Sequence, residues 1–540
     1  MLRLQEIKLP LDHPPAALTA AVLARLGIGA DELVSCTVFR RGCDARQRNH
    51  IALIYAVDVA VRNEAAVRQR LAHDHRVTLT PTEQYHFPVT APAGLKSRPV
   101  IIGMGPCGLL AGLVLAQNGF RPLLLERGKC VRERAVDTAS FWRDGVLNPA
   151  SNVQFGEGGA GTFSDGKLYS QIKDRAQRGQ KVLDELVAAG ALPEIKVASK
   201  PHIGTARLVQ LVENLRRTII TLGGEVRFNS RVDELDIADG VVRGVVLASG
   251  ERYAASHVIM AIGHSARDTF EMLHRCGVQS EPKPFAIGVR IEHPQALIDA
   301  ARFGRHAGHP LLGAADYKLV HHCANGRTVY SFCMCPGGTV VGAASEAGGV
   351  VTNGMSQYAR DAANANAALV VGIAPADYPG GPLAGIALQQ RCERQAFVLG
   401  GGKYHAPCQL VGDFLAGRAS TAGGAVVPSY QPGVQWGALD SCLPDYVVAA
   451  LREALPAFDR QLPGFARPDA VLTGVETRTS SPVRLVRGDD CQSVTLRGLF
   501  PAGEGAGYAG GILSSAVDGI RVAEAVAVAL TGAGGGPGAG

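Results

Sequence analysis

The sequence predicts an α/β protein with three parts: a Rossmann-like domain split along the chain, a mixed α+β domain inserted into it, and an N-terminal ferredoxin-like α+β domain. Three observations support this. An apolar strand runs into glycines at 100–108, a second strand–glycine–helix segment occupies 499–528, and strands alternate with helices before residue 92. We place the domain boundaries at 1–92, 97–280, 281–470 and 471–530, followed by a disordered Gly- and Ala-rich tail at 531–540.

The bulk composition is that of a globular protein rather than a disordered one. Of the 540 residues, 46% are hydrophobic and 19% are charged. A net charge of +6 is small for this length, so it does not indicate a nucleic acid or an anionic membrane as partner. The start of the chain has no apolar signal segment, and no stretch reads as a membrane span. The 12 cysteines show neither a CxxC pair nor a zinc-binding Cys/His spacing. We therefore expect a cytoplasmic protein with reduced thiols and no metal site.

The first 92 residues follow the order strand, helix, strand, strand, helix, strand. We expect strands at 2–8, 33–39, 51–61 and 76–79, with helices at 16–26 and 64–73. This order is the ferredoxin-like pattern. RNA-binding domains share that scaffold, and segment 39–48 is basic, so an RNA contact is one alternative. The nearly balanced charge of the domain favours a contact with another domain or a partner protein instead.

The segment 100–108 contains the pattern GxGxxG between a predicted strand and a predicted helix. Gly103 permits the tight turn, Gly105 lets the backbone approach a pyrophosphate, and Gly108 lets the helix pack on the strand. Pro106 and Cys107 lie at the start of the helix, where free N–H groups and the helix dipole favour phosphate. The sequence therefore predicts a dinucleotide site here.

An acidic residue and two arginines follow the next predicted strand. Glu126 lies 23 residues after Gly103, where its carboxylate can accept hydrogen bonds from both ribose hydroxyls of an adenosine. A 2′-phosphate would be repelled there. Arg127 and Arg134 either screen the pyrophosphate or belong to a solvated surface, and the sequence leaves both alternatives open.

The C-terminal segment favours FAD over NAD as the dinucleotide. Gly503 and Glu504 follow a strand, as does the Gly–acid pair that binds the ribityl chain of FAD. A helix over 514–528 then directs its N-terminus at the flavin, where it stabilises negative charge on the reduced ring. The residues placed under the ring are Gly510, Gly511 and Ile512. Two weaker signals agree: Gly263 closes a strand-to-loop segment, and Val232 lies where the backbone would contact adenine.

These features and several longer segments resemble the bacterial and plastid FAD-dependent dehydrogenases, within the glutathione-reductase-like flavoprotein superfamily. The segments that carry the resemblance are 151–167, 200–205, 283–295, 331–338 and 476–484. The resemblance implies a bound FAD and a ferredoxin-like N-terminal domain, but no particular substrate. Cys43 departs from the family pattern, in which we expect Ser. In the first segment, Gly158 and Gly159 allow close backbone approach and Thr162 can donate to phosphate or flavin oxygens.

No catalytic residue can be assigned, because flavin itself performs hydride transfer. Cys333 and Cys335 form either a redox pair near the flavin or a packed strand–turn, and we favour the second. Segment 290–293 and the arginines at 478 and 484 are candidates for substrate or flavin contacts, with structural ion pairs as the alternative. His264 is more typical of a loop cap than of a base.

The mid-chain contains no second GxGxxG after a strand, so we expect no dedicated NAD(P)H domain. Transient binding of NAD(P)H in the substrate cleft and an external electron carrier are the alternatives. The leading hypothesis is an FAD-dependent oxidoreductase that transfers hydride between FAD and a small organic substrate. The other readings are an RNA-associated flavoprotein, a non-catalytic flavin redox sensor and an NAD dehydrogenase without flavin.

Overall fold

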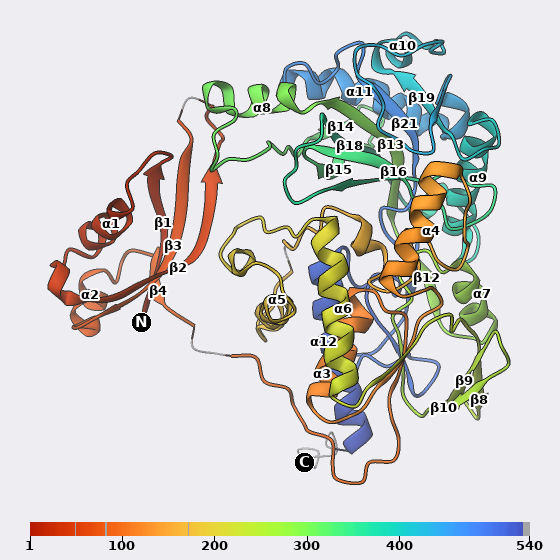
Figure 1. The fold of residues 1–540 in the computed structure, drawn as a ribbon, viewed down its shortest axis with the longest axis horizontal. Coiled ribbons are helices and arrows are strands. Elements are labelled where there is room, and N and C mark those ends of the chain that lie inside the picture. Colours follow the sequence, from red (N-terminus) through yellow and green to blue (C-terminus); the bar gives the residue numbers. More distant parts are fainter. Residues whose placement is uncertain (49, 82–83, 171, 533–540) are drawn as a thin grey trace.

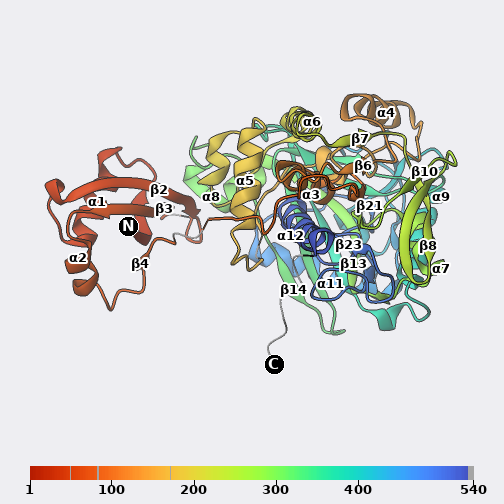
Figure 2. The same cartoon turned by 90° about the horizontal axis from the view of Figure 1, so that it is seen from below.

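The computed structural model describes residues 1–48, 50–81, 84–170 and 172–532. A small N-terminal domain stands to one side of a larger body that contains the rest of the chain (Figures 1 and 2). The predicted tail at 531–540 falls mainly on residues 533–540, which lie outside the described residues, whereas Thr531 is the last residue of a helix.

The N-terminal domain has the predicted order of strands and helices. Its strands pair antiparallel in the order β2-β3-β1-β4. Residues along β3 alternate between buried and partly buried, so one face of the sheet forms the small core beneath the helices. The elements are β1 (Leu2–Pro10), α1 (Ala16–Leu26), β2 (Leu33–Asp44), β3 (Ala52–Val61), α2 (Glu64–Arg70) and β4 (Val77–Leu79).

Strand β2 extends five residues beyond its predicted end at 39. The extension pairs with the start of β3. Its outer edge also exchanges backbone hydrogen bonds with a loop of the main body: Arg41 N–H donates to Val197 at 2.7 Å, and Ser199 N–H donates to Arg41 at 2.8 Å. Part of the basic segment 39–48 is therefore a strand that joins the N-terminal domain to the body of the protein.

The predicted split of the parallel sheet is confirmed. The sheet has the order β23-β11-β5-β6-β7, and every neighbouring pair is parallel. Strand β23 comes from the C-terminal end of the chain, yet it pairs with β11 beside the glycine-loop strand β5. These strands are β5 (Val100–Ile102), β6 (Leu123–Leu125), β7 (Glu225–Arg227), β11 (Val258–Met260) and β23 (Leu499–Pro501). A separate antiparallel sheet contains β8 (Val232–Ala238), β9 (Val241–Leu247) and β10 (Arg252–Ala254).

Two helices from distant parts of the chain pack directly on each other beside the parallel sheet. Helix α3 (Pro106–Gln117) is buried from Cys107 to Ala116, and α12 (Ile512–Thr531) lies against it (Figure 1). At the closest approach, a Cβ added to Gly519 would lie 2.2 Å from the carbonyl oxygen of Cys107. The other helices of this domain are α4 (Val131–Asp144), α5 (Arg178–Ala188), α6 (Thr205–Thr221) and α7 (Arg267–Arg275).

The inserted domain is built on a mixed sheet in the order β14-β15-β18-β13-β21-β19-β20. Its longest pairing joins β13 (Phe285–Pro294) and β18 (Asn364–Ile373) along ten residue pairs. The other strands of this sheet are β14 (Val320–His322), β15 (Thr328–Cys335), β19 (Ala406–Leu410), β20 (Val434–Trp436) and β21 (Val471–Glu476). A smaller hairpin pairs β16 (Gly338–Gly342) with β17 (Thr352–Ser356), and the helices are α8 (Gln295–Phe303), α9 (Ala384–Leu399), α10 (Val411–Ala416) and α11 (Asp445–Gln461).

The predicted domain boundary at 470/471 is wrong, because β21 lies inside the inserted sheet between β13 and β19. The chain returns to the parallel-sheet domain only at β22 (Val483–Leu485), which pairs with β12 (Ser280–Pro282) on the outgoing chain. Strand β21 is buried along its whole length because it lies in the interior of the sheet. The sequence alone does not show which sheet the strand joins.

We expect Gly519→Ala to destabilise the protein by about 1–3 kcal/mol, because the added methyl group collides with rigid backbone rather than with a movable side chain. The measurement is denaturant unfolding followed by far-UV circular dichroism. Gly372→Ala is the matched control, since a Cβ there meets no atom within 4 Å. Equal unfolding midpoints for the two variants would contradict the tight α3–α12 contact.

Candidate functional site

A cavity lies where the parallel-sheet domain meets the inserted domain. Its walls include the glycine loop, the end of β6, the loop 154–167, the loop after β11 and the start of α12. The inserted domain contributes residues from β15, β17 and the end of β21. The predicted site residues that line the cavity are Gly103, Gly105, Pro106, Cys107, Glu126, Arg127, Gly159, Val232, Gly263, Glu504, Gly511 and Ile512. Segments nearly four hundred positions apart therefore form one site.

Gly103 and Gly108 have the local roles that their spacing predicts, whereas the predicted approach of Gly105 to a pyrophosphate stays a prediction. Gly103 has φ of 97°, and a Cβ there would lie 2.4 Å from the carbonyl oxygen of Ala261. A Cβ on Gly108 would lie 1.9 Å from the Gly103 carbonyl oxygen, so Gly108 allows α3 to pack on its own loop. Gly105 precedes α3, and a Cβ there would meet only the Cα of Gly159, at 3.8 Å. The space beside Gly105 is thus left free for a ligand.

Glu126 joins three segments of the cavity wall. Its side chain is 4% exposed and accepts backbone hydrogen bonds from Met104 at 2.8 Å, from Gly128 at 2.9 Å and from Gly156 at 3.0 Å. A carboxylate offers about four acceptor positions. One therefore remains for a ligand, and the predicted contact with a ribose stays a prediction.

Both alternatives left open for Arg134, a contact with the pyrophosphate and a place on a solvated surface, are wrong. The guanidinium is fully buried outside the cavity lining. All five of its N–H groups donate to backbone carbonyl oxygens, namely those of Asn152, Val153, Gly156, Glu157 and Gly159. Arg134 therefore holds the loop 152–159 in shape, and no N–H is left for a phosphate.

Gly158 and Thr162 also shape this loop rather than line the cavity. The Gly158 N–H donates to the Met104 carbonyl at 2.8 Å, which ties the loop to the glycine turn. The Thr162 hydroxyl donates to the Glu157 carbonyl at 3.4 Å. Both residues are therefore placed one layer behind the surface that a ligand would touch.

Arg127 lies on the cavity wall and is fixed by its neighbours. Its guanidinium pairs with Asp268 at 2.8 Å and lies over the Phe155 ring, 4.4 Å from the ring centre. Val232, at the start of β8, lines the same end of the cavity. This part of the cavity wall therefore offers an apolar side chain and a cation.

The opposite end of the cavity is formed by the C-terminal segment. The predicted residues Gly503 and Gly510 lie outside the lining of the cavity. The Gly503 N–H instead donates a hydrogen bond to the Asp518 carboxylate at 2.7 Å. Glu504 lines the cavity and accepts a hydrogen bond from the Gly511 N–H at 3.2 Å. Burial raises the pKa of Glu504 to about 7. Helix α12 begins at Ile512, so its N-terminus opens into the cavity.

The cavity fits a dinucleotide with a flat ring at one end. A Cβ on Gly263 or on Gly511 would meet no protein atom within 4 Å, and both glycines border the cavity. The backbone is therefore exposed at two places where a planar group needs close approach. His264, beside Gly263, also lines the cavity, and burial lowers its pKa to about 3, so it is neutral.

Sequence reasoning missed an ion-pair cluster behind the cavity wall. Glu393 of α9 is buried and pairs with Arg267 at 2.8 Å and with Arg478 at 2.9 Å. Two neighbouring arginines hold the pKa of Glu393 well below its usual range despite burial. Arg478 lines the cavity and Arg484 does not. A single Glu within an amphipathic helix gives no sequence signal, because its partners lie on α7 and in the segment after β21, far from it along the chain.

The three candidates at 290–293 have structural partners. Arg290 is fully buried and pairs with Glu476 at 3.1 Å. The Glu292 carboxylate accepts a hydrogen bond from the Ser429 hydroxyl at 2.5 Å. The His293 Nε2 atom lies 2.6 Å from the Phe465 carbonyl oxygen. These partners favour the structural ion-pair alternative over direct contact with an anionic substrate.

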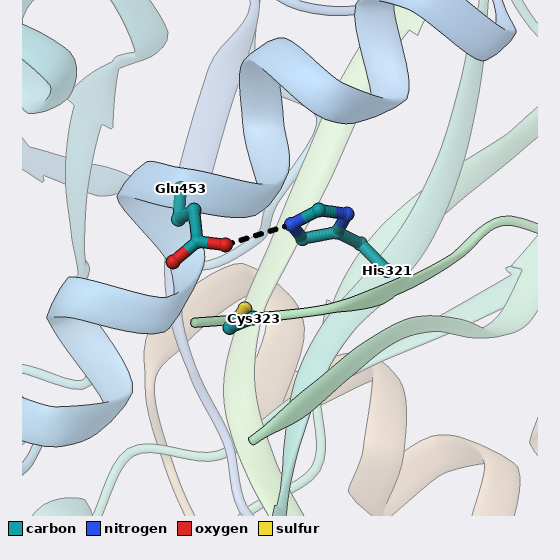
Figure 3. A group of neighbouring side chains, drawn as sticks. All are labelled: His321, Cys323 and Glu453. Carbon is teal, nitrogen blue, oxygen red and sulfur yellow. Dashed lines mark hydrogen bonds and ion pairs between the residues drawn. The ribbon is translucent and has the colours of Figure 1, made fainter. Parts of the chain in front are cut away.

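A group of potential metal ligands lies apart from the cavity, between β14 and α11. Figure 3 shows His321, Cys323 and Glu453, whose ligand atoms lie within 4.8 Å of one another. Glu453 already accepts hydrogen bonds from His321 at 3.0 Å and from the Ala324 N–H at 3.0 Å. These hydrogen bonds join α11 to β14 and the residues that follow it, which explains why the three side chains lie together without a metal ion.

Comparison with known proteins identifies the class of protein. The family described as FAD-dependent protein, C-terminal domain-like, matches residues 284–479. This range contains β21, which the structure also places in the inserted domain. A domain of unknown function matches residues 1–60. The chain is an FAD-dependent flavoprotein, and FAD is its cofactor.

The family is established by a relative from Clostridium beijerinckii, described as an uncharacterized protein. It is 48% identical over 525 residues, which cover 97% of this chain and 98% of the relative. The chain therefore belongs to the same family of FAD-dependent proteins.

Similarity to solved structures is weaker. Glycine oxidase from Bacillus cereus is 12% identical, with 81% of this chain and 96% of that chain covered and a TM-score of 0.32. A flavoprotein/dehydrogenase from Cytophaga hutchinsonii is 12% identical, with 82% and 79% covered and a TM-score of 0.34. Similarity at this level does not assign an activity.

Within the part of the chain that the structure describes, none of the helices has the length and apolar character of a membrane span.

We expect Glu126→Gln to weaken FAD binding by about tenfold to a hundredfold, because charge-assisted hydrogen bonds contribute about 1.5–3 kcal/mol. The amide also places an NH2 group against backbone donors. The measurement is fluorescence titration of FAD into FAD-free protein. Glu251→Gln, on the surface beside β10, is the control and should bind FAD as the wild type does.

The raised pKa of Glu504 predicts a stability that falls as pH rises from about 4.5 to above 7. The folded state holds this proton in that window and the unfolded state has lost it, so raising the pH favours unfolding. Glu504→Gln removes the titration. In FAD-free protein, the variant should gain stability over the wild type between pH 5 and pH 8, on the order of 3 kcal/mol. A difference that stays constant with pH would contradict the raised pKa.

Proposed function

We propose that the protein is an FAD-dependent oxidoreductase of the dehydrogenase type, which transfers hydride between bound FAD and a small organic substrate. The observation that carries the proposal is the composition of the cavity. One wall has the glycine loop, the Glu126 carboxylate and the N-terminus of α12, and the other is a polar surface from the inserted domain. A site of this kind can hold a dinucleotide and leave room for a second molecule beside its reactive end.

The chain offers a distinct contact for each part of FAD. Val232 and Arg127 lie where the adenosine would bind, and the loop from Gly103 to Cys107 faces the phosphates. Glu504 and Gly511 lie at the flavin end, where the N-terminus of α12 favours negative charge on the ring. Bound FAD supplies the hydride chemistry, and these residues bind and orient it.

The polar wall from the inserted domain supports a small polar substrate. Arg478, Thr352 and Asn353 come from the inserted domain, and Lys167, at the end of the loop 154–167, adds a second cation to the lining. Lys167 pairs with Asp165 at 3.2 Å and Arg478 with Glu393, so both cations are fixed and largely compensated. Such a wall orients a polar group through hydrogen bonds and excludes water around the reacting atoms. The electron partner is either NAD(P)H bound transiently in this cleft or an electron carrier.

The N-terminal domain is, in this proposal, a ferredoxin-like module that acts through its contact with the body of the protein. Its strand order β4-β1-β3-β2 and the backbone bonds of Arg41 support this reading. The proposed location is the cytoplasm, which is supported by the twelve cysteines, all of which are free thiols.

The purified protein is expected to be yellow and to release FAD on denaturation. Anaerobic addition of NADH, NADPH or fractions of a metabolite pool should bleach the flavin absorption with at least one donor. Gly105→Val is the matched variant: its backbone tolerates a side chain and the cavity has room, so it should fold but remain colourless. A colourless wild type, or a flavin that no donor reduces, would overturn the proposal.

A further inference from the structure

Two cysteines of β15 lie at the cavity wall that the inserted domain provides. Cys333 lines the cavity together with Lys167 and Glu476, and Cys335 is fully buried directly behind it. Of the twelve cysteines, Cys107 is the other one on the lining. Burial raises the pKa of Cys107 well above the usual thiol range, so that thiol is inert.

The backbone at these cysteines departs from a regular strand. The pairing of β15 with β18 shifts register between Phe332 and Cys335, and Cys333 has φ of 42°, in the left-handed region. The Cys335 thiol donates to the Cys333 carbonyl oxygen at 3.3 Å. In a regular extended strand, same-face thiols two residues apart close into a disulfide only with strain, whereas a bulge bends the strand and re-aims its side chains. The strand–turn favoured from the sequence is thus a bulge that gathers two thiols.

Two cations flank the pair. The Lys167 ammonium lies 3.9 Å from the Cys335 sulfur and donates to the Met334 carbonyl. Arg290 donates a hydrogen bond to the Cys333 carbonyl oxygen at 3.3 Å. The neighbouring Cys335 thiol, and then the charges of Lys167 and Arg290, lower the pKa of Cys333 well below the usual thiol range. The other titratable groups that face Cys333 are Asp165, Tyr169, Glu476 and Glu504.

We propose that Cys333 and Cys335 form a redox-active dithiol that exchanges two electrons with the FAD bound in the same cavity. In the forward direction the two thiols lose two protons and two electrons as one S–S bond forms, and FAD takes up both electrons and both protons. In the reverse direction reduced FAD returns them and the S–S bond breaks. The inference rests on the proposed placement of FAD and deepens the proposed function, because it gives the protein a second two-electron store beside the flavin.

An anaerobic reductive titration of the air-oxidised holoprotein with dithionite tests the proposal. The wild type should consume two equivalents of two electrons per FAD, whereas Cys335→Ser should consume one. Cys43→Ser, an exposed cysteine of the N-terminal domain, is the control and should behave as the wild type. Mass spectrometry after alkylation supplies a readout that does not depend on activity: Cys333 and Cys335 should be blocked before reduction and labelled after it.

The thiolate character of Cys333 has its own readout. At pH 7, iodoacetamide should label reduced Cys333 faster than the more exposed Cys43, whose pKa is raised by burial and by Asp44. Lys167→Met should slow the labelling of Cys333 at pH 7 and leave it unchanged at pH 10, where both proteins carry the thiolate. Slower labelling of Cys333 than of Cys43 would contradict this part of the proposal.

The outcomes separate this inference from the proposed function. A wild type that consumes one equivalent, with both thiols free before reduction, overturns the dithiol and leaves a flavin that external donors still reduce. A protein that binds no FAD overturns both. A dithiol that is titrated as expected, in a protein whose flavin no organic donor reduces, supports the inference and overturns only the proposed hydride transfer from a small substrate.

Discussion

The parallel pairing of β23 with β11 is the constraint on which the rest of the structure depends. It brings the C-terminal segment beside the glycine loop, and it delivers α12 onto α3, where Gly519 faces the Cys107 carbonyl without an intervening side chain. Both helices begin at the cavity, so two helix N-termini point into one volume. The cavity therefore forms only when both ends of the domain are in place.

The inserted domain is held in position by buried charge as well as by strands. Its entry and exit strands β12 and β22 pair with each other, which fixes the direction in which the domain leaves. Glu393 of the inserted domain forms ion pairs with Arg267 of α7 and with Arg478 of the segment after β21. Removing one member of such a buried cluster leaves an uncompensated charge, so the cluster resists any sliding of one domain over the other.

The sequence predicts best the features whose cause is local. The turn at Gly103, the packing at Gly108 and the order of strands and helices in the N-terminal domain follow from glycine spacing and apolar periodicity, and the structure contains them. The role of Arg134 could not be predicted in this way. The carbonyl oxygens that accept hydrogen bonds from its guanidinium come together only after the loop 152–159 has folded. The predicted domain boundary at 470/471 is wrong for the same reason, because β21 belongs to the inserted domain through its pairing with β13 and β19.

The contact between β2 and the loop 197–199 has a mechanical consequence. The same loop continues into residues 201–203, which pair with residues 166–168 through an antiparallel bridge between Lys167 and His202 and two backbone bonds. A continuous ladder of main-chain bonds therefore runs from the outer edge of the small domain to the lysine beside the two thiols. Hydrogen bonds between peptide groups stretch little, so these bonds tie the position of the outer strand of the small domain to the position of Lys167 in the cavity wall.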